Sequence, residues 1–224
     1  MNDARPFVKV CGITSEADAF VCVGLGVDAL GFIFAPSPRQ MSTSSVADIV
    51  KRLPSEVLTV GVFKDEAPAR VAEIANGIGL GAVQLHGHET PQDTAYVAER
   101  VACTIKAFSA GDPQVASFDR FGCELMLIDA ESPGSGEVFD WRLAEGVVDH
   151  GRLIVSGGLH SGNVAQAIAR LHPLGVDVAT GVEASPGHKD PKKLSQFVSA
   201  VRAVAYQDAA HEEGTSPYDW LAER

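Results

Sequence analysis

Short apolar runs alternate along the chain with segments that carry the spacing of amphipathic helices. The runs predict strands near Phe7–Val10, Asp28–Ile33, Leu58–Phe63, Ala82–Leu85, Thr104–Ala107, Leu125–Ile128, Leu153–Val155 and Asp177–Ala179. The segments between them predict helices near Ser15–Gly24, Ser44–Arg52, Pro68–Asn76, Pro91–Arg100, Pro113–Phe118, Trp141–Glu145, Ser161–Leu171 and Pro191–Ala205, of which the fifth and sixth are short. The strands are almost wholly apolar, which is typical of a parallel sheet buried on both faces. Eight β/α repeats of about 25 residues favour a single (β/α)8 TIM barrel with a parallel eight-stranded core over an open doubly wound sheet.

The periodic pattern stops after Ala205, so we expect a barrel domain over residues 1–205 and a polar C-terminal tail over 206–224. The tail is acid-rich and contains Trp220 and Leu221. One interpretation is a tail that frays or lies loosely over the surface, as chain ends commonly do. The alternative is that Trp220 and Leu221 anchor it to the barrel or to a partner.

Charge and composition limit the classes of partner that the protein is expected to bind. The chain has 18 basic and 29 acidic residues, a net charge of −11, and such a surface repels nucleic acid and anionic lipid. No apolar run approaches the roughly 18 to 20 residues of a membrane span, and the N-terminus lacks the pattern of a secretory signal. We therefore expect no nucleic-acid and no membrane partner, and a cytoplasmic location.

Metal and disulfide sites are not expected. Cys11, Cys22, Cys103 and Cys123 are scattered without a CxxC pair, and the histidines show no ligand spacing. The sequence also lacks a P-loop and a GxGxxG turn in the context of a dinucleotide fold.

Two glycine turns follow the last two predicted strands. One is Val155-Ser-Gly-Gly-Leu159, and the other ends the run Gly175-Val-Asp-Val-Ala-Thr-Gly-Val-Glu183. In a (β/α)8 barrel the loops after the seventh and eighth strands commonly bind phosphate through backbone N–H groups. The pattern predicts a small phosphorylated substrate.

Active sites of such barrels lie at the carboxyl ends of the strands, so polar residues there are the candidates. They are Lys9, Cys11, Arg39, Lys64, Asp65, His86, Lys106, Asp129, Asp177 and Glu183. Cys11 follows the first strand, where a nearby cation such as Lys9 can lower the pKa of a thiol, although packing is an equal alternative. Asp129 ends a fully apolar strand, where burial would raise its pKa and suit it to general acid catalysis; the alternative is a turn or cap.

Arg39 and His86 are candidates for binding. Arg39 lies in a loop stiffened by two prolines, and a guanidinium pairs well with a carboxylate or phosphate; a solvated arginine is the alternative. His86 ends the fourth strand, where a structural histidine is the commoner case.

Taken together, the motifs resemble the phosphoribosylanthranilate isomerase family of tryptophan biosynthesis. The resemblance runs from about Phe7 to Ala205 and rests on Lys9-Val-Cys-Gly-Ile-Thr14, Gly31-Phe-Ile-Phe34, Ser37-Pro-Arg39, Val60-Gly-Val-Phe63, Val83-Gln-Leu-His-Gly87, Phe139-Asp-Trp141, Ser156-Gly-Gly-Leu159, Gly175 to Glu183 and Pro186-Gly-His-Lys-Asp190.

The resemblance implies a cofactor-free Amadori rearrangement of N-(5-phosphoribosyl)anthranilate to 1-(2-carboxyphenylamino)-1-deoxyribulose 5-phosphate. By position, Cys11 matches the family's general base, Asp129 its general acid and Arg39 the residue that holds the anthranilate carboxylate. The turns at Gly157-Gly158 and Gly181-Val182 match its phosphate site, and His86 is expected to contact substrate. The protein is expected as a monomer or a homodimer.

Two other functions stay open at this point. The related isomerase of histidine synthesis catalyses a similar rearrangement, but it typically uses two aspartates where this chain has Cys11 and Asp129. A phosphosugar-binding barrel without activity would be expected to lack Cys11 or Asp129, and both are present.

Overall fold

Eight parallel strands form a closed barrel in the computed structural model, which describes residues 5–130, 141–143 and 153–204. The strands are β1 (Phe7–Cys11), β2 (Ala29–Ile33), β3 (Leu58–Phe63), β4 (Ala82–Leu85), β5 (Thr104–Ser109), β6 (Leu125–Asp129), β7 (Leu153–Val155) and β8 (Gly175–Val178). Each strand pairs with the next, and β1 closes the ring by pairing with β8, where Lys9 lies opposite Asp177. The predicted TIM barrel is confirmed.

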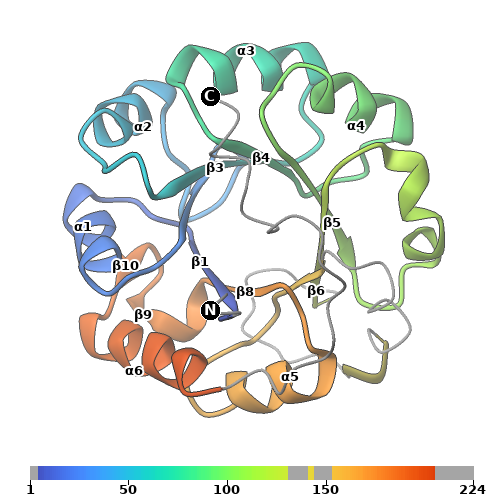
Figure 1. Ribbon diagram of the computed structural model, residues 1–224. Coiled ribbons are helices and arrows are strands. Elements are labelled where there is room, and N and C mark those ends of the chain that lie inside the picture. Colours follow the sequence, from blue (N-terminus) through green and yellow to red (C-terminus); the bar gives the residue numbers. More distant parts are fainter. Residues whose placement is uncertain (1–4, 131–140, 144–152, 205–224) are drawn as a thin grey trace.

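Helices surround the barrel as an outer ring (Figure 1). They are α1 (Glu16–Gly24), α2 (Thr43–Val50), α3 (Pro68–Ile78), α4 (Pro91–Ala98), α5 (Val164–Leu171) and α6 (Pro191–Arg202), with the 3-10 segments η1 (Pro113–Phe121), η2 (Trp141–Leu143) and η4 (Thr180–Val182). Capping residues in the sequence determine where several of the helices begin. The Ser15 side chain caps α1, and Thr90 forms a capping box with Asp93 at the start of α4.

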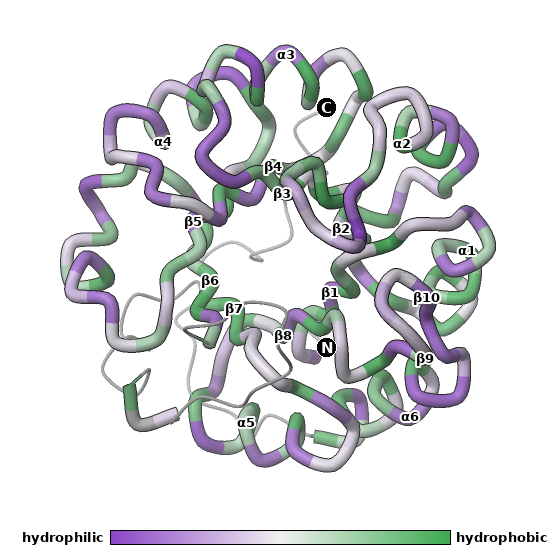
Figure 2. The backbone as a smooth tube through the Cα atoms, turned by 180° about the vertical axis from the view of Figure 1, so that it is seen from behind, coloured by the Kyte–Doolittle hydropathy of each residue, from purple (hydrophilic) through white to green (hydrophobic). Residues whose placement is uncertain are grey.

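The strand residues are buried on both faces because the barrel has two apolar layers. Alternate side chains fill the interior, among them Val60, Ala82, Ile105 and Leu127. The intervening ones pack under the helices in a larger cluster. Figure 2 shows the resulting contrast between largely hydrophobic strands and helices with mixed surfaces. This two-layer burial explains why the strand sequences do not alternate.

The fifth and sixth predicted helices are 3-10 helices in the structure. In η1, Val115, Phe118 and Phe121 are buried, and this spacing of three residues matches the three-residue turn of a 3-10 helix. A kink at Ser117 interrupts its helical backbone. The predicted continuation of the sixth helix to Glu145 lies outside the described residues.

Other boundaries also differ from the prediction. The strands β1 and β6 extend to include Cys11 and Asp129, so both side chains belong to the barrel itself. A two-stranded antiparallel hairpin, β9 (Glu183–Ser185) and β10 (His188–Lys189), follows η4 and was not predicted. Its strands are too short to leave a periodic signal.

The predicted tail, 206–224, lies outside the described residues, as does Ala205. Within the part of the chain that the structure describes, no helix is long and apolar enough to span a membrane.

A buried ion pair joins β5 to the loop that follows β4. Lys106 points away from the barrel interior and donates to Glu89 Oε2 at 2.9 Å, and both side chains are almost fully buried. The same ammonium donates to the carbonyls of Gly87 and Ala107, and Glu89 accepts from the backbone N–H groups of Asp65 and Gly87. Lys106 therefore serves the scaffold and not the site for which it was a candidate.

We expect Lys106→Met to lower the free energy of unfolding by about 3–5 kcal/mol, because it leaves the Glu89 carboxylate buried without its cation. The matched control is Arg70→Met, which removes the exposed Arg70–Glu73 pair and should cost less than about 1 kcal/mol. Urea denaturation monitored by circular dichroism measures both. Equal losses in the two variants would contradict the structural role of the buried pair.

Candidate active site

A cavity of about 230 Å³ opens at the carboxyl ends of the strands. Its lining includes six of the predicted site residues, Cys11, Arg39, His86, Asp129, Gly157 and Gly158. The predicted Gly181 and Val182 are not part of the lining; Ala179 and Thr180 of the same segment are. The cavity therefore lies at the end of the barrel where the sequence analysis expects the site.

A buried ion pair forms the floor beneath the thiol. Lys9 Nζ lies 2.8 Å from Asp177 Oδ1, with side-chain exposures of 0% and 6%. Lys9 and Cys11 are two residues apart on β1 and therefore point to the same side, into the barrel. Ser156 Oγ lies 3.4 Å from the other oxygen of Asp177, which extends the polar floor toward β7.

Burial raises the pKa of the Cys11 thiol above its ordinary value. Lys9 and Lys189 oppose this rise by favouring the thiolate, whereas Asp177 adds to it. The cation considered from the sequence is thus present, but it does not lower the pKa below the ordinary value. The thiol is protonated at neutral pH in the empty site.

Burial also raises the pKa of Asp129, to about 6. The negative charge of Asp177 acts in the same direction, while the backbone N–H of Ala130, which donates to Asp129 Oδ1 at 2.8 Å, opposes it. This is the direction expected from the burial of a carboxyl group at the end of an apolar strand. A carboxyl that retains part of its protonated population near neutral pH is suited to donate a proton.

His86 faces Asp129 from β4. Its Nε2 lies 3.5 Å from Asp129 Oδ2, and its Nδ1 lies 2.8 Å from Gln84 Nε2. Desolvation by burial lowers the pKa of His86 to about 4, with opposing contributions from Asp177 and Glu89 that raise it. The imidazole is therefore neutral at physiological pH.

Arg39 is held in the loop after β2 by a bidentate ion pair. Its Nε and Nη2 donate to the two carboxylate oxygens of Glu183 at 2.8 and 2.7 Å. Lys189 Nζ donates to Glu183 Oε1 at 2.9 Å, so one carboxylate pairs with two cations and a net positive charge remains. The pair with Glu183 uses two of the five N–H donors of the guanidinium.

The two glycine turns lie against each other. Gly157 and Gly158 have φ values of +82° and +61°, which favour glycine and turn the chain tightly after β7. A Cβ at Gly181 would come within 1.9 Å of the Leu159 carbonyl oxygen, so the close contact of the turns requires glycine there. Gly181 therefore contributes through packing, and the lining on this side includes Gly157, Gly158, Ala179 and Thr180.

Two further candidates from the sequence, Asp65 and Lys64, differ in their position relative to the cavity. Asp65 is exposed and contacts His88, whereas Lys64 lines the cavity. Sequence reasoning missed Gln84, which lines the cavity from within the apolar strand β4. A buried amide in an otherwise apolar run was the available signal, because such a group needs a hydrogen-bond partner.

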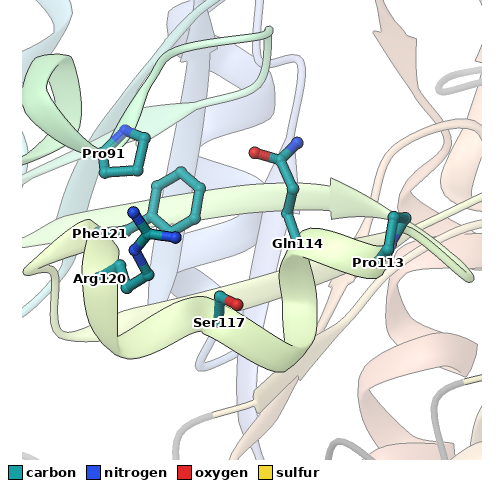
Figure 3. Close-up of a pocket in the computed structure, with 6 residues that line it drawn as sticks. All are labelled: Pro91, Pro113, Gln114, Ser117, Arg120 and Phe121. Carbon is teal, nitrogen blue, oxygen red and sulfur yellow. The ribbon is translucent and has the colours of Figure 1, made fainter.

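A second, smaller hollow lies in the outer ring, between the start of α4 and the 3-10 segment η1 (Figure 3). It is lined by Pro91, Pro113, Gln114, Ser117, Arg120 and Phe121. Its one ionisable residue, Arg120, is exposed, so this hollow lacks the buried charged groups of the barrel cavity. Among the described residues, no group of three or more His, Cys, Asp and Glu side chains is placed to hold a metal ion.

A family model and individual relatives of known name both place the chain in the same family. The family model described as N-(5'phosphoribosyl)anthranilate (PRA) isomerase matches residues 8–200. An N-(5'-phosphoribosyl)anthranilate isomerase of Desulforudis audaxviator is 46% identical over 202 residues, which cover 87% of this chain and 97% of that protein. That of Pelobacter propionicus is 42% identical over 197 residues, with coverage of 85% and 93%.

Solved structures agree. The phosphoribosyl anthranilate isomerase of Thermotoga maritima superimposes with a TM-score of 0.82 at 37% identity, over 89% of this chain and 100% of that chain. A second similar structure, with a TM-score of 0.80, 36% identity and the same coverage, holds reduced 1-(o-carboxyphenylamino)-1-deoxyribulose 5-phosphate.

We expect the Asp129 carboxyl to titrate near pH 6 in the folded protein. Because its pKa is raised, it is mainly protonated at pH 5, where an ordinary aspartate is ionised. Carbon-13 NMR of labelled aspartates, assigned with Asp129→Asn, measures this pKa. Asp190 is the internal control, since backbone hydrogen bonds at the start of α6 hold its pKa below the ordinary value. A pKa of Asp129 at or below 4 would contradict the assignment.

Proposed function

The chain belongs to the phosphoribosylanthranilate isomerase family, and from this premise we propose that Cys11 is the general base and Asp129 the general acid of its reaction. The protein is an isomerase of tryptophan biosynthesis. It converts N-(5-phosphoribosyl)anthranilate to 1-(2-carboxyphenylamino)-1-deoxyribulose 5-phosphate. Family membership decides against the histidine-pathway alternative. The observation that carries the proposed roles is that a thiol and a protonatable carboxyl line one cavity.

The reaction needs one group that gives a proton and one that takes a proton. Asp129 protonates the furanose ring oxygen, the bond from that oxygen to C1 breaks, and the nitrogen lone pair forms a Schiff base at C1. Cys11, as thiolate, then removes the proton from C2; the electron pair of that C–H bond forms the C1=C2 double bond, and the π pair of the C1=N bond returns to nitrogen, which gives an enolamine. The enolamine tautomerises to the aminoketone.

The pKa values of Asp129 and Cys11 are in the reverse of the order that this mechanism needs: the group that must be protonated has the lower pKa. Asp129 must be protonated but has a pKa of about 6, and Cys11 must be ionised but has a raised pKa. The active form, with the proton on Asp129 and not on Cys11, is therefore a minor fraction. Its population is constant between the two pKa values and falls on either side.

The two ends of the substrate are assigned to the two sides of the cavity. We assign the anthranilate carboxylate to the free N–H groups of Arg39, and the phosphate to the backbone N–H groups near Gly157, Gly158 and the Thr180–Val182 turn. Backbone donors suit a chain with net charge −11, because an anion must be held by local groups. The ligand named for the similar structure carries both a carboxyphenyl and a phosphate group, as a site with two anion-binding ends requires.

The remaining proposals concern partners and domains. We propose a cytoplasmic enzyme that acts without a nucleic-acid or membrane partner, as a monomer or a homodimer; a dimeric phosphoribosylanthranilate isomerase is known from Thermotoga maritima. Residues 1–205 carry the activity, and residues 206–224 contribute no catalytic group. The family match, which ends at residue 200, supports this boundary.

We expect Cys11→Ala and Asp129→Asn each to lower kcat by about 10²- to 10⁴-fold, the usual contribution of an acid or base, with a much smaller change in substrate affinity. The assay follows the loss of absorbance or fluorescence of freshly generated phosphoribosylanthranilate. In Asp129→Asn, kcat/KM should lose its break near pH 6 and rise steadily with pH, because only the thiol still titrates. A variant that keeps a third of the wild-type rate would refute its residue's role.

Arg39→Ala should weaken binding of the carboxyphenylamino product analogue but leave inorganic phosphate binding unchanged. Gly158→Val should do the opposite, because a side chain there blocks the approach of phosphate to the backbone and strains a positive φ. Calorimetric titration of both ligands into both variants gives the comparison. If each substitution weakened both ligands equally, the division between two anion sites would be wrong.

Truncation after Ala205 should leave kcat nearly unchanged, because the tail supplies no candidate catalytic group. If Trp220 and Leu221 pack on the barrel, the truncated protein should show a lower Tm, since burial of a large apolar side chain contributes about 1.5–3 kcal/mol before the entropy of ordering is subtracted. Single-turnover kinetics and thermal denaturation separate the two effects. A large fall in kcat of the stable truncated protein would show that the tail reaches the site.

A further inference from the structure

Gln84 lies directly behind the pair formed by His86 and Asp129. It is 1% exposed and, like His86 two residues later, points into the barrel from the β4 side. Its Nε2 lies 2.8 Å from His86 Nδ1, and His86 Nε2 lies 3.5 Å from Asp129 Oδ2. The three side chains thus form one row that ends at the carboxyl group to which we assign the acid.

The hydrogen bonds decide where the imidazole carries its proton. A neutral histidine has one N–H and one acceptor nitrogen, and an amide N–H can only donate. When Gln84 Nε2 donates to His86 Nδ1, the proton of the imidazole must be on Nε2, which faces Asp129. The reverse orientation of the amide would place the proton on Nδ1 and turn an Nε2 lone pair toward the carboxylate.

Gln84 makes this contact at the expense of its own carbonyl. Its Oε1 is buried and has no hydrogen-bond partner among the described residues. An unsatisfied buried acceptor normally destabilises the folded protein, so its presence needs an explanation. The contact with His86 uses one end of the amide and the other end stays unpaired in either orientation, so the unpaired group accompanies the contact with His86.

We propose that Gln84 is a positioning residue for the acid: its amide fixes the Nε2–H tautomer of His86, and His86 donates that hydrogen to Oδ2 of Asp129. This inference rests on the proposed role of Asp129. Asp129 Oδ1 already accepts from the N–H of Ala130, and Ser156 also acts on this carboxyl, so His86 adds a donor at Oδ2. At 3.5 Å the contact is longer than an ordinary hydrogen bond, so the proposal requires it to shorten when substrate binds.

The arrangement helps the proton transfer itself. When Asp129 gives its proton to the ring oxygen, negative charge develops on the carboxylate, and a donor already aimed at Oδ2 stabilises it more than it stabilises the neutral acid. A neutral donor is needed, because an imidazolium would hold Asp129 ionised. The charged groups that act on His86 from neighbouring elements are Lys9 and Lys106, which lower its pKa together with burial, and Asp177 and Glu89, which raise it.

The direct test is the tautomer of His86. Long-range ¹H–¹⁵N correlation of the full-length protein labelled at histidine, assigned with His86→Gln, should show the Nε2–H form from pH 5 to pH 8. Gln84→Glu presents a carboxylate that accepts from Nδ1–H, so the Nδ1–H form should replace it. Gln114→Met, at the exposed start of η1, is the control and should leave the spectrum of His86 unchanged. A wild-type protein in the Nδ1–H form would overturn the proposal.

A double-mutant cycle separates positioning from a purely structural role. Gln84→Met, which keeps the length of the side chain but removes the donor, should lower kcat about 10-fold with little change in KM, as expected for the loss of one hydrogen bond. In the Asp129→Asn background the same substitution should cost less than 2-fold, because the acid is already absent. An equal cost in both backgrounds would refute coupling to Asp129.

The outcomes also distinguish this proposal from the proposed function. If Asp129→Asn alone retained full activity, the acid would be another group, whatever the tautomer of His86. If Asp129→Asn were inactive but wild-type His86 carried its proton on Nδ1, the acid would stand and the role of Gln84 would fall.

Discussion

The ion pair between Lys9 and Asp177 is the constraint around which the site is built. It joins β1 to β8 where the barrel closes, and both side chains are buried in the interior. A buried charge without a partner would cost several kcal/mol, so neither residue can change alone. Both charges also act on Cys11 and on Asp129, and they do so with opposite signs. One pair thus couples the closure of the barrel to the electrostatics of Cys11 and Asp129, the proposed base and acid.

The space around the Lys9–Asp177 pair is also restricted. A Cβ at Gly31 would lie 2.8 Å from Cys11 Sγ and 3.2 Å from Lys9 Nζ, so β2 must carry glycine beside them. Cys11 is only 6% exposed, so a thiolate there would be poorly solvated, and burial accordingly raises the pKa of the thiol. The low dielectric that opposes ionisation in the empty site also strengthens the effect of Lys9 on the thiolate once it forms.

The sequence predicted the barrel and most of the cavity for a simple reason: apolar runs mark strands, and a barrel gathers their carboxyl ends. That reasoning placed Cys11, Asp129, Arg39 and His86 without any contact information. It could not tell that Lys9 points inward and Lys106 outward, because both lie within apolar strands and the side of a residue depends on register. Glu89 and Glu183 pair with buried cations. Some of these partners lie far away in the sequence, so the pairs are evident only in the folded structure.

Two buried lysine–glutamate pairs lie outside the barrel interior and hold the backbone at the ends of β1 and β4. Lys189, neutralised by Glu183, donates to the carbonyl of Cys11, and Lys106, neutralised by Glu89, donates to that of Gly87, which follows His86. Each ammonium satisfies backbone acceptors at a point where the strand ends and its ladder of hydrogen bonds stops. The side chains of Cys11 and His86 therefore remain available to the cavity, because their backbones are held by groups outside its lining. The short hairpin β9–β10 has its physical purpose here: it carries Lys189 to the back of Cys11.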